Sequence, residues 1–220
     1  MVIDLGTGSG QAVLRRARQD PDKLVIGVDA DAAAMADSSR RAAASVRHGG
    51  LPNALFLTAS AEDLPGPLRG SATLITIALP WGSLLRGLLA ADARLIEAVA
   101  ACLRPKGELQ ILLSATDRDE AANSTLLDER EAARLASAYE SAGLQVVEYR
   151  QADESDVARL SSGWGRRLGI PRRRPAWLFR ATPGPLSVQP AEQVAPARVP
   201  TCRCTRRAAE QACRVSGTGC

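Results

Sequence analysis

Short hydrophobic runs alternate with segments of helical periodicity along most of the chain. The runs predict strands over residues 2–5, 24–28, 53–58, 71–79, 108–114, 144–150 and 176–181. The segments between them predict helices over residues 11–19, 32–46, 84–89, 93–103, 128–142 and 155–160. Strands that alternate with helices are typical of a mostly parallel sheet with helices on both faces. The pattern therefore predicts an α/β fold with a seven-stranded sheet.

A glycine-rich turn joins the first predicted strand to the first helix. Gly6, Gly8 and Gly10 follow Asp4 in the spacing Asp-x-Gly-x-Gly-x-Gly, which differs from the G-x-G-x-x-G of dinucleotide sites. An acid directly before the turn suits a ligand with a cationic amine better than a pyrophosphate, which it would repel. A second acid, Asp29, ends the next strand, where a carboxylate can bind ribose hydroxyls. The two acids predict a site for S-adenosylmethionine (SAM), and the alternative is an ordinary αβ turn with a chance aspartate.

The third predicted strand ends in a loop that adds candidate cofactor residues. This loop, 59–65, contains Ala61, Glu62 and Asp63. In open α/β sheets, ligands bind outside the carboxyl ends of the strands, so the loop is expected to border the adenine of the cofactor. Glu62 or Asp63 can accept a hydrogen bond from the exocyclic amine of that adenine.

The fourth predicted strand ends in Ala78-Leu79-Pro80-Trp81. SAM enzymes that methylate exocyclic amines commonly carry Asn or Asp at the first of these positions, followed by prolines and an aromatic residue. Ala78 offers no acceptor for an amine proton, whereas Pro80 and Trp81 remain. This favours stacking of a flat substrate whose reacting atom has its own lone pair, such as adenine N1, so that catalysis is mainly positioning. No cysteine stands where it could attack a pyrimidine ring, which disfavours C5 methylation.

A loop over 161–174 combines aromatic, glycine and basic residues. Trp164 stands between two glycines, and the arginines that follow it are Arg166, Arg167, Arg172, Arg173 and Arg174. Such a mixture is typical of a loop that contacts nucleic-acid phosphates and stacks on a base. The alternative is a solvated basic loop, with Trp164 buried in the core as Trp177 of the last strand is expected to be.

Composition narrows the class of protein. With 220 residues and 45% hydrophobic content, the chain can form one α/β domain with a substantial core, and its net charge is only +4. No apolar run approaches the roughly 20 residues of a membrane span, and no secretory leader is evident. From residue 183 onward the chain is rich in Pro, Ala, Arg and Cys, which predicts a domain over 1–182 and a disordered tail over 183–220. The tail cysteines have spacings that match no zinc pattern, so no metal is expected: Cys202, Cys204, Cys213 and Cys220.

Several segments resemble the aminoglycoside-resistance 16S ribosomal RNA adenine-1408 N1-methyltransferases. They are DLGTGSG, GVDAD, GGLPNALFLTASAEDLP, LPWGSLLRGLL and SGWGRRLG, and the resemblance covers about residues 2–181. It implies a Rossmann-like class I methyltransferase fold with SAM as the cofactor. It also implies a cytoplasmic, monomeric enzyme whose partner is 16S rRNA in the 30S subunit, with no membrane partner.

The resemblance assigns roles to particular residues. Asp4, Asp29 and Glu62 hold the cofactor, in a set completed by Gly6, Gly8, Gly10, Ala61, Ala78 and Ser162. Trp81 and Trp164 stack on the flipped adenine, and Ser83 lies near the same pocket. Basic residues face the ribosomal RNA: Arg40, Arg41, Arg47, Arg166, Arg167, Arg172, Arg173 and Arg174.

Two parts of the chain differ from the family pattern. The β-hairpin that precedes the glycine strand in the family is expected to be missing, and the loop 116–127 matches poorly. The expected function is SAM-dependent methylation of adenosine N1 in the decoding region of 16S rRNA, which confers aminoglycoside resistance. One alternative is a SAM methyltransferase for another RNA or a small planar molecule. A second is a truncated, inactive relative that still binds SAM or RNA.

Overall fold

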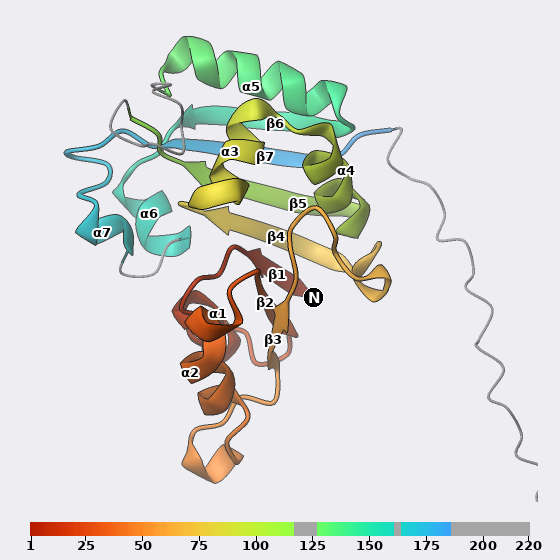
Figure 1. Ribbon diagram of the computed structural model, residues 1–220, viewed down its shortest axis with the longest axis vertical. Coiled ribbons are helices and arrows are strands. Elements are labelled where there is room, and N and C mark those ends of the chain that lie inside the picture. Colours follow the sequence, from red (N-terminus) through yellow and green to blue (C-terminus); the bar gives the residue numbers. More distant parts are fainter. Residues whose placement is uncertain (117–126, 161–163, 186–220) are drawn as a thin grey trace, which may run out of the picture. The chain divides into compact units, whose positions relative to one another are not determined.

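One mixed sheet organises the described residues of the computed structural model, which are 1–116, 127–160 and 164–185 and lie within the first unit of the chain, Met1–Pro190. Its strand order is β3-β2-β1-β4-β5-β7-β6 (Figure 1). The strands are β1 Val2–Leu5, β2 Val25–Asp29, β3 Ala54–Thr58, β4 Ala72–Ala78, β5 Leu103–Leu113, β6 Leu144–Gln151 and β7 Trp177–Pro183. β1 to β5 pair in parallel, whereas β7 is antiparallel to both β5 and β6. The predicted mostly parallel seven-stranded sheet is confirmed.

Helices cover both faces of this sheet. They are α1 Gln11–Gln19, α2 Ala32–Ala42, α3 Gly82–Ala90, α4 Ala93–Cys102, α5 Glu129–Ser141, α6 Glu154–Leu160 and α7 Trp164–Arg167. Two short 3-10 turns, η1 Val46–His48 and η2 Gly66–Leu68, flank β3. α6 and α7 lie beyond the carboxyl ends of β4 and β5, on the side to which those arrows point (Figure 1).

The alternation of side chains along β5 separates the cores on the two faces. Leu109 and Leu113 belong to the large cluster that contains α3, α4 and α5, whereas Leu112 packs in a second cluster with Val157 of α6. Because successive strand residues point to opposite faces, α6 lies on the face opposite α5. A third cluster packs α1 and α2 against β1, β2 and β3.

The structure differs from the predicted boundaries at three elements. The helix predicted over 32–46 ends at Ala42, because the chain turns back there and the Leu51 N–H donates to the Ala42 carbonyl at 2.9 Å. β5 begins at Leu103, before the predicted start at residue 108, since Leu103 already pairs with Ala72 ahead of a register shift. The loop predicted over 161–174 contains the short helix α7.

Two further findings concern the described residues only. No helix among them has both the length and the apolar character needed to cross a membrane. In the same part of the chain, no group of His, Cys, Asp and Glu side chains is arranged to hold a metal ion. The expectation of a disordered tail falls, from residue 186 on, outside the described residues.

Candidate functional site

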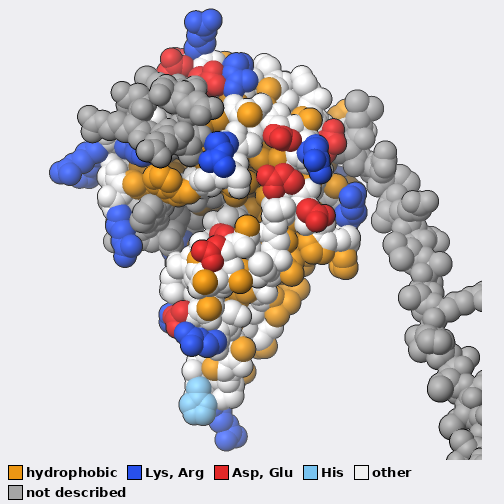
Figure 2. Space-filling view, viewed as in Figure 1, with side chains coloured by type: hydrophobic (Ala, Val, Ile, Leu, Met, Phe, Trp, Pro, Cys, Tyr) orange, Lys and Arg blue, Asp and Glu red, His pale blue; other side chains and the backbone are white. Residues whose placement is uncertain are grey.

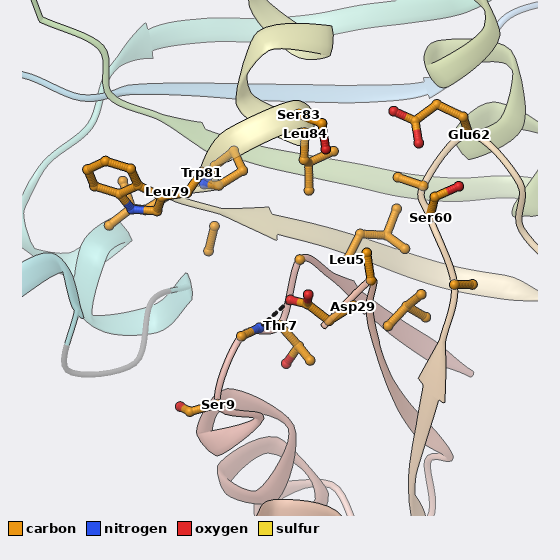
Figure 3. A pocket seen from close by; sticks show the side chains of 18 of the residues that line it. Leu5, Thr7, Ser9, Asp29, Ser60, Glu62, Leu79, Trp81, Ser83 and Leu84 are labelled. Carbon is orange, nitrogen blue, oxygen red and sulfur yellow. Dashed lines mark hydrogen bonds between the residues drawn. The ribbon is translucent and has the colours of Figure 1, made fainter. Parts of the chain in front are cut away.

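A cavity of about 570 Å³ lies at the carboxyl edge of the parallel strands (Figure 3). This is the edge at which open α/β sheets bind their ligands, and the volume falls in the range of small-molecule sites. Its walls contain many of the predicted site residues: Gly6, Gly8, Asp29, Ala61, Glu62, Ala78, Trp81, Ser83 and Arg167. Trp81 and Glu62 lie at opposite ends of the cavity in Figure 3, with Asp29 between them.

The glycine turn is held against the end of β2 by hydrogen bonds. Asp29 Oδ2 accepts from the Gly8 N–H at 2.7 Å, which is the dashed line in Figure 3, and Asp29 Oδ1 accepts from the Asp31 N–H at 2.9 Å. The Val28 carbonyl accepts from the Gly6 N–H at 2.8 Å. A carboxylate has about four lone-pair positions, so Asp29 keeps acceptor capacity for hydroxyl groups of a ligand.

Gly8 and Gly10 of the turn are required for different structural reasons. Gly8 has a φ of +54°, and a Cβ there would meet no atom within 4 Å, so a side chain would extend into the space at the cavity wall. Gly10 is buried, and a Cβ there would collide with the Phe56 ring and with Ser38. Gly8 therefore leaves room for a ligand, whereas Gly10 allows α1 to pack closely on β3 and α2.

Asp4 lies beneath the turn and is not among the residues that line the cavity. It is only 7% exposed, and it accepts hydrogen bonds of 2.7 Å from the hydroxyls of Thr7 and Thr76. Burial raises the pKa of the Asp4 carboxyl, against the opposing effect of the two threonine hydroxyls. In this position Asp4 braces the glycine turn, and its predicted contact with the cofactor amine stays a prediction.

The opposite wall of the cavity is formed where β4 ends. Leu79 has a φ of +52°, a backbone conformation that is rare for a residue with a large side chain. This conformation buries the Leu79 side chain in the cluster beneath α6 and brings Pro80 and Trp81 to the cavity wall. Trp81 is 48% exposed, and Ser83 follows it in the first turn of α3. A half-exposed indole on a cavity wall presents a flat surface on which a planar group can stack.

The predicted basic residues fall into separate groups. Arg40 and Arg41 end α2 and Arg47 lies in η1, and Figure 2 shows basic side chains and the single histidine at that end of the fold. Arg167 of α7 lines the cavity itself. Arg173 is exposed.

Two of the predicted basic residues have partners within the protein. Arg172 pairs with Glu154 at 2.6 Å on the surface. Arg174 is partly buried and donates to the Ser114 hydroxyl at 2.7 Å and to the Ser114 carbonyl at 2.9 Å. Arg174 therefore also fastens its loop to the end of β5.

Some predicted residues cannot be placed in this geometry. Ser162 lies outside the described residues, and so do the side chains of Trp164 and Arg166, whose backbone belongs to α7. The pairing of Trp164 with Trp81 thus stays a prediction. Trp177 is buried as predicted, and its indole N–H donates to the Leu127 carbonyl at 2.9 Å.

Leu79 and Pro80 of the predicted strand end line the cavity, and so do further residues that the sequence did not single out: Leu5, Thr7, Ser9, Gln11, Val28, Ala30, Ala59, Ser60 and Leu84. Most of them are neighbours of predicted residues at the strand ends, so proximity to Asp29, Ala61 and Trp81 was the available signal. Leu84 directly follows the predicted Ser83, but its approach to Gly6 could not be predicted, because it depends on how α3 packs over the turn.

The polar and apolar groups that line the cavity fit SAM. Asp29 can accept from ribose hydroxyls, and Glu62 can accept from an adenine amine. Leu5, Val28 and Leu84 supply apolar surface for the adenosine. SAM would bring to this site a methyl group on a positively charged sulfur. The sheet order, the glycine turn and these acids define the chain as a class I SAM-dependent methyltransferase.

Comparison with known proteins identifies the family within that class. The model of the NpmA family, described as 16S rRNA (adenine(1408)-N(1))-methyltransferase, matches residues 1–182. The chain belongs to this family.

Relatives and solved structures agree with this assignment. The 16S rRNA (adenine(1408)-N(1))-methyltransferase of Streptoalloteichus hindustanus is 39% identical over 184 residues, which cover 79% of this chain and 82% of the relative. The crystal structure of the aminoglycoside resistance methyltransferase NpmB1 is 36% identical with a TM-score of 0.70, covering 82% of this chain and 86% of the other. A tryptophan-to-alanine mutant of the Catenulisporales acidiphilia 16S rRNA (adenine(1408)-N(1))-methyltransferase, solved with the cosubstrate SAM, is 27% identical with a TM-score of 0.74 over 83% of this chain and 85% of that one.

Proposed function

We propose that this chain transfers the methyl group of SAM to N1 of adenosine 1408 in 16S rRNA, the reaction named for its relatives. One observation carries the proposal: the half-exposed Trp81 indole lies on the wall of the cavity that also contains Gly8 and Asp29. A base stacked on that indole would lie beside a cofactor held by the turn. The structural neighbour NpmB1 is described as an aminoglycoside resistance methyltransferase, and the proposed reaction includes the same resistance for this chain.

The residues of the cavity perform this reaction by positioning. Adenine N1 carries a lone pair in the plane of the ring, so no side chain has to remove a proton before the N1–CH₃ bond forms and the S–CH₃ bond breaks. Trp81 orients the flipped base by stacking, Ser83 can hydrogen-bond its edge, and Asp29 and Glu62 orient the cofactor. The walls exclude water from one side of the base.

The proposal also specifies the substrate particle and the part of the chain that acts on it. The substrate is the assembled 30S subunit in the cytoplasm, met by a monomeric methyltransferase domain over residues 1–182. The exposed arginines of α2 and η1 and Arg167 on α7 contact its phosphates. The flipped base is held between two indoles, with Trp81 on one face and Trp164 on the other. Trp164 comes six residues before the buried Ile170.

Primer extension on 30S subunits treated with the full chain and SAM tests the reaction, because N1 methylation blocks base pairing in reverse transcription. We expect a stop one nucleotide 3′ of adenosine 1408, which disappears without SAM. A stop elsewhere would support methylation of another RNA position. Binding of SAM without modification of any RNA would support an inactive relative.

The Trp81→Ala variant tests whether stacking carries the reaction. Base stacking contributes about 1–3 kcal/mol, so we expect methylation to fall by about tenfold or more while SAM affinity in calorimetry stays close to the wild-type value. Trp81→Phe is expected to be milder, since a π-face remains. Trp177→Phe is the matched control: it loses the hydrogen bond to Leu127 and is expected to lower the melting temperature instead.

A further inference from the structure

A closed ring of hydrogen-bonded side chains fastens α6 to the sheet. The members on β5, β7 and β6 are, in ring order, Gln110, Glu108, Arg180, Glu148 and Arg150. Asp156 and Arg159 of α6 complete the ring. Each link is a hydrogen bond of 2.6–3.0 Å between side chains, so the ring joins three strands and one helix without a gap.

The sheet part of the ring follows from strand register. Gln110 of β5 pairs with Arg180 of β7, which pairs with Glu148 of β6, so the three side chains stand in one row on one face. Gln110 Nε2 donates to Glu108 Oε1 at 2.8 Å. Arg180 donates to Glu108 at 2.6 Å and to Glu148 at 2.9 Å. An arginine between two acids is a bridge across neighbouring strands.

The helix part of the ring links Asp156 and Arg159 of α6 to the strands. Arg150 donates to Glu148 at 2.8 Å and to Asp156 at 2.6 Å. Arg159 donates to Asp156 at 3.0 Å and to Gln110 at 2.6 Å, which closes the ring. Asp156 is only 3% exposed, so this acid would be costly to bury without its two arginines. α6 has only 7 residues, too few to be stable by itself, and therefore depends on such fastening.

The acids of the ring stay charged over the physiological pH range. Burial raises the pKa of Asp156, but hydrogen bonds from Arg150 and Arg159 outweigh burial and bring the pKa to about 2. Partial burial likewise raises the pKa of Glu108, yet Arg180 and Gln110 hold it below its usual value. Protonation of these acids therefore does not break the ring near neutral pH.

The second hydrophobic cluster connects α6 with the target side of the cavity. Val157 and Leu160 of α6 pack with Leu79, Leu112 and Ile170. Leu79 stands two residues before the stacking Trp81, and Ile170 follows α7, the helix that brings Arg167 to the cavity. This one cluster therefore supports both the end of β4 and the segment that follows α7, and Val157 and Leu160 of α6 form one side of the cluster.

We propose that this ring is a positioning device for catalysis: through Asp156 and Arg159 it holds α6 in place, and α6 holds the end of β4 and α7 at the separation that receives the base. The proposal rests on the proposed function for its substrate. None of the ring residues lines the cavity, so they are positioning residues. We therefore expect the ring to affect kcat, the rate of methyl transfer once SAM and the 30S subunit are bound.

Gln110→Leu is the main test, because it removes two ring links without changing the charge of the protein. The electrostatic attraction between the protein and RNA therefore stays the same. Arg159→Gln and Arg159→Lys accompany it, since the lysine keeps a cation near Asp156 and should rescue part of the effect. Arg134→Gln is the matched control for Arg159→Gln: Arg134 lies on α5, at the opposite face of the sheet, and its replacement removes hydrogen bonds to Glu131 of α5 and to the Leu89 carbonyl of α3.

Three measurements on the full chain separate positioning from general stability. Hydrogen exchange of the α6 and α7 amides is expected to rise about tenfold or more in Gln110→Leu and Arg159→Gln, and to stay unchanged in the control. SAM affinity is expected to remain within about twofold, because Asp4 and Asp29 take no bonds from the ring. For 30S methylation, kcat is expected to fall about tenfold or more with little change in KM.

Unchanged hydrogen exchange of α6 and α7 in the ring variants would overturn the proposal. An equal loss of kcat in Arg134→Gln would also overturn it, when each variant is assayed at the same interval below its own melting temperature. A loss of 30S affinity with normal kcat would also overturn it, since that would place the ring in binding. If the wild-type chain itself fails to methylate 30S subunits, the proposed function fails. Hydrogen exchange then still decides whether the ring holds the α6–α7 segment.

Discussion

At the scale of single residues, the cofactor side of the cavity depends most on Asp29. Its carboxylate holds the Gly8 and Asp31 amides and also lines the cavity, so it joins the geometry of the turn to ligand binding. Asp29→Ala is expected to weaken SAM binding by about 1.5–3 kcal/mol, the range for a hydrogen bond to a charged group. Calorimetry measures this directly. Asp31→Ala, which removes the cap of α2 without touching the cavity, is the control, and an unchanged Asp29→Ala affinity in a folded protein would refute the assignment.

The glycine turn permits a second residue-scale test. Gly8→Ala places a methyl group at the cavity wall and strains a left-handed backbone by about 1–2 kcal/mol, so we expect a folded protein with strongly reduced SAM affinity. Gly10→Ala places the same group against Phe56 and Ser38, so we expect a larger loss of melting temperature. Thermal unfolding and calorimetry on both variants check the contrast. Equal melting temperatures would show that Gly10 has no packing role.

Sequence reasoning could predict which charged and aromatic residues lie on the cavity wall, but it could not predict the surroundings of other residues. Asp29 and Trp81 could be predicted because each ends a strand at the edge where ligands bind. For Asp4, the Asp-x-Gly-x-Gly-x-Gly spacing could not show that Thr7 and Thr76 would enclose the carboxylate, since Thr76 comes from a strand far away in the chain. The same limit applies to Arg174, whose attachment to Ser114 is a long-range contact.

At the scale of elements, α6 illustrates what periodicity cannot show. The hydrophobic pattern predicted a short helix over 155–160, and α6 occupies Glu154–Leu160. The ring that fastens it depends on the pairing of β7 with both β5 and β6, and no local pattern encodes that pairing. The segment of α7 was predicted to be a loop, because a four-residue helix that follows one glycine and contains another has almost no periodic signal.

The charge state of Asp156 gives an element-scale prediction. Its pKa of about 2 lies below the ordinary 3.8, so its stabilising effect is complete above about pH 4 and is lost as the pH falls to about 2. Asp156→Asn removes this effect, so its stability deficit relative to wild type should shrink by about 2 kcal/mol between pH 6 and pH 2. Urea unfolding across this range measures the deficit. The exposed Asp22→Asn is the control and should follow the wild-type curve, whereas a constant deficit in Asp156→Asn would contradict the buried ion pair.

At the scale of the whole fold, the sheet order was only partly predictable. Alternating strands and helices indicated a parallel sheet, and β1 to β5 follow that rule. The insertion of β7 between β5 and β6, which gives the order β3-β2-β1-β4-β5-β7-β6, was not predicted, because hydrophobic patterning does not encode which strands pair. This order places α6 and α7 beside the end of β4, so that one edge of the sheet carries both the cofactor turn and the target-facing residues.

Docking on ribosomal RNA should draw on basic residues beyond the cavity, and here the ion pairs decide which ones matter most. Arg40 already pairs with Asp37 at 3.4 Å, whereas within the described residues Arg41 and Arg47 pair with no acidic side chain. Each phosphate contact contributes about 0.7–0.9 to the slope of log affinity against log salt. Arg41→Ala with Arg47→Ala is therefore expected to flatten the salt dependence of 30S binding by about one to two units, and Arg40→Ala by less. Filter binding at several salt concentrations measures the slope.

The control for this measurement is Arg104→Ala, which removes an exposed arginine near the amino end of β5, at the edge of the sheet opposite the cavity. Its slope should match the wild-type slope, because counterion release depends on contact and not on net charge alone. SAM affinity should be the same in all these variants, since none of the four arginines lines the cavity. If Arg41→Ala with Arg47→Ala kept the wild-type slope, α2 and η1 would be a solvated surface, and docking would rest on Arg167 and the residues that follow it.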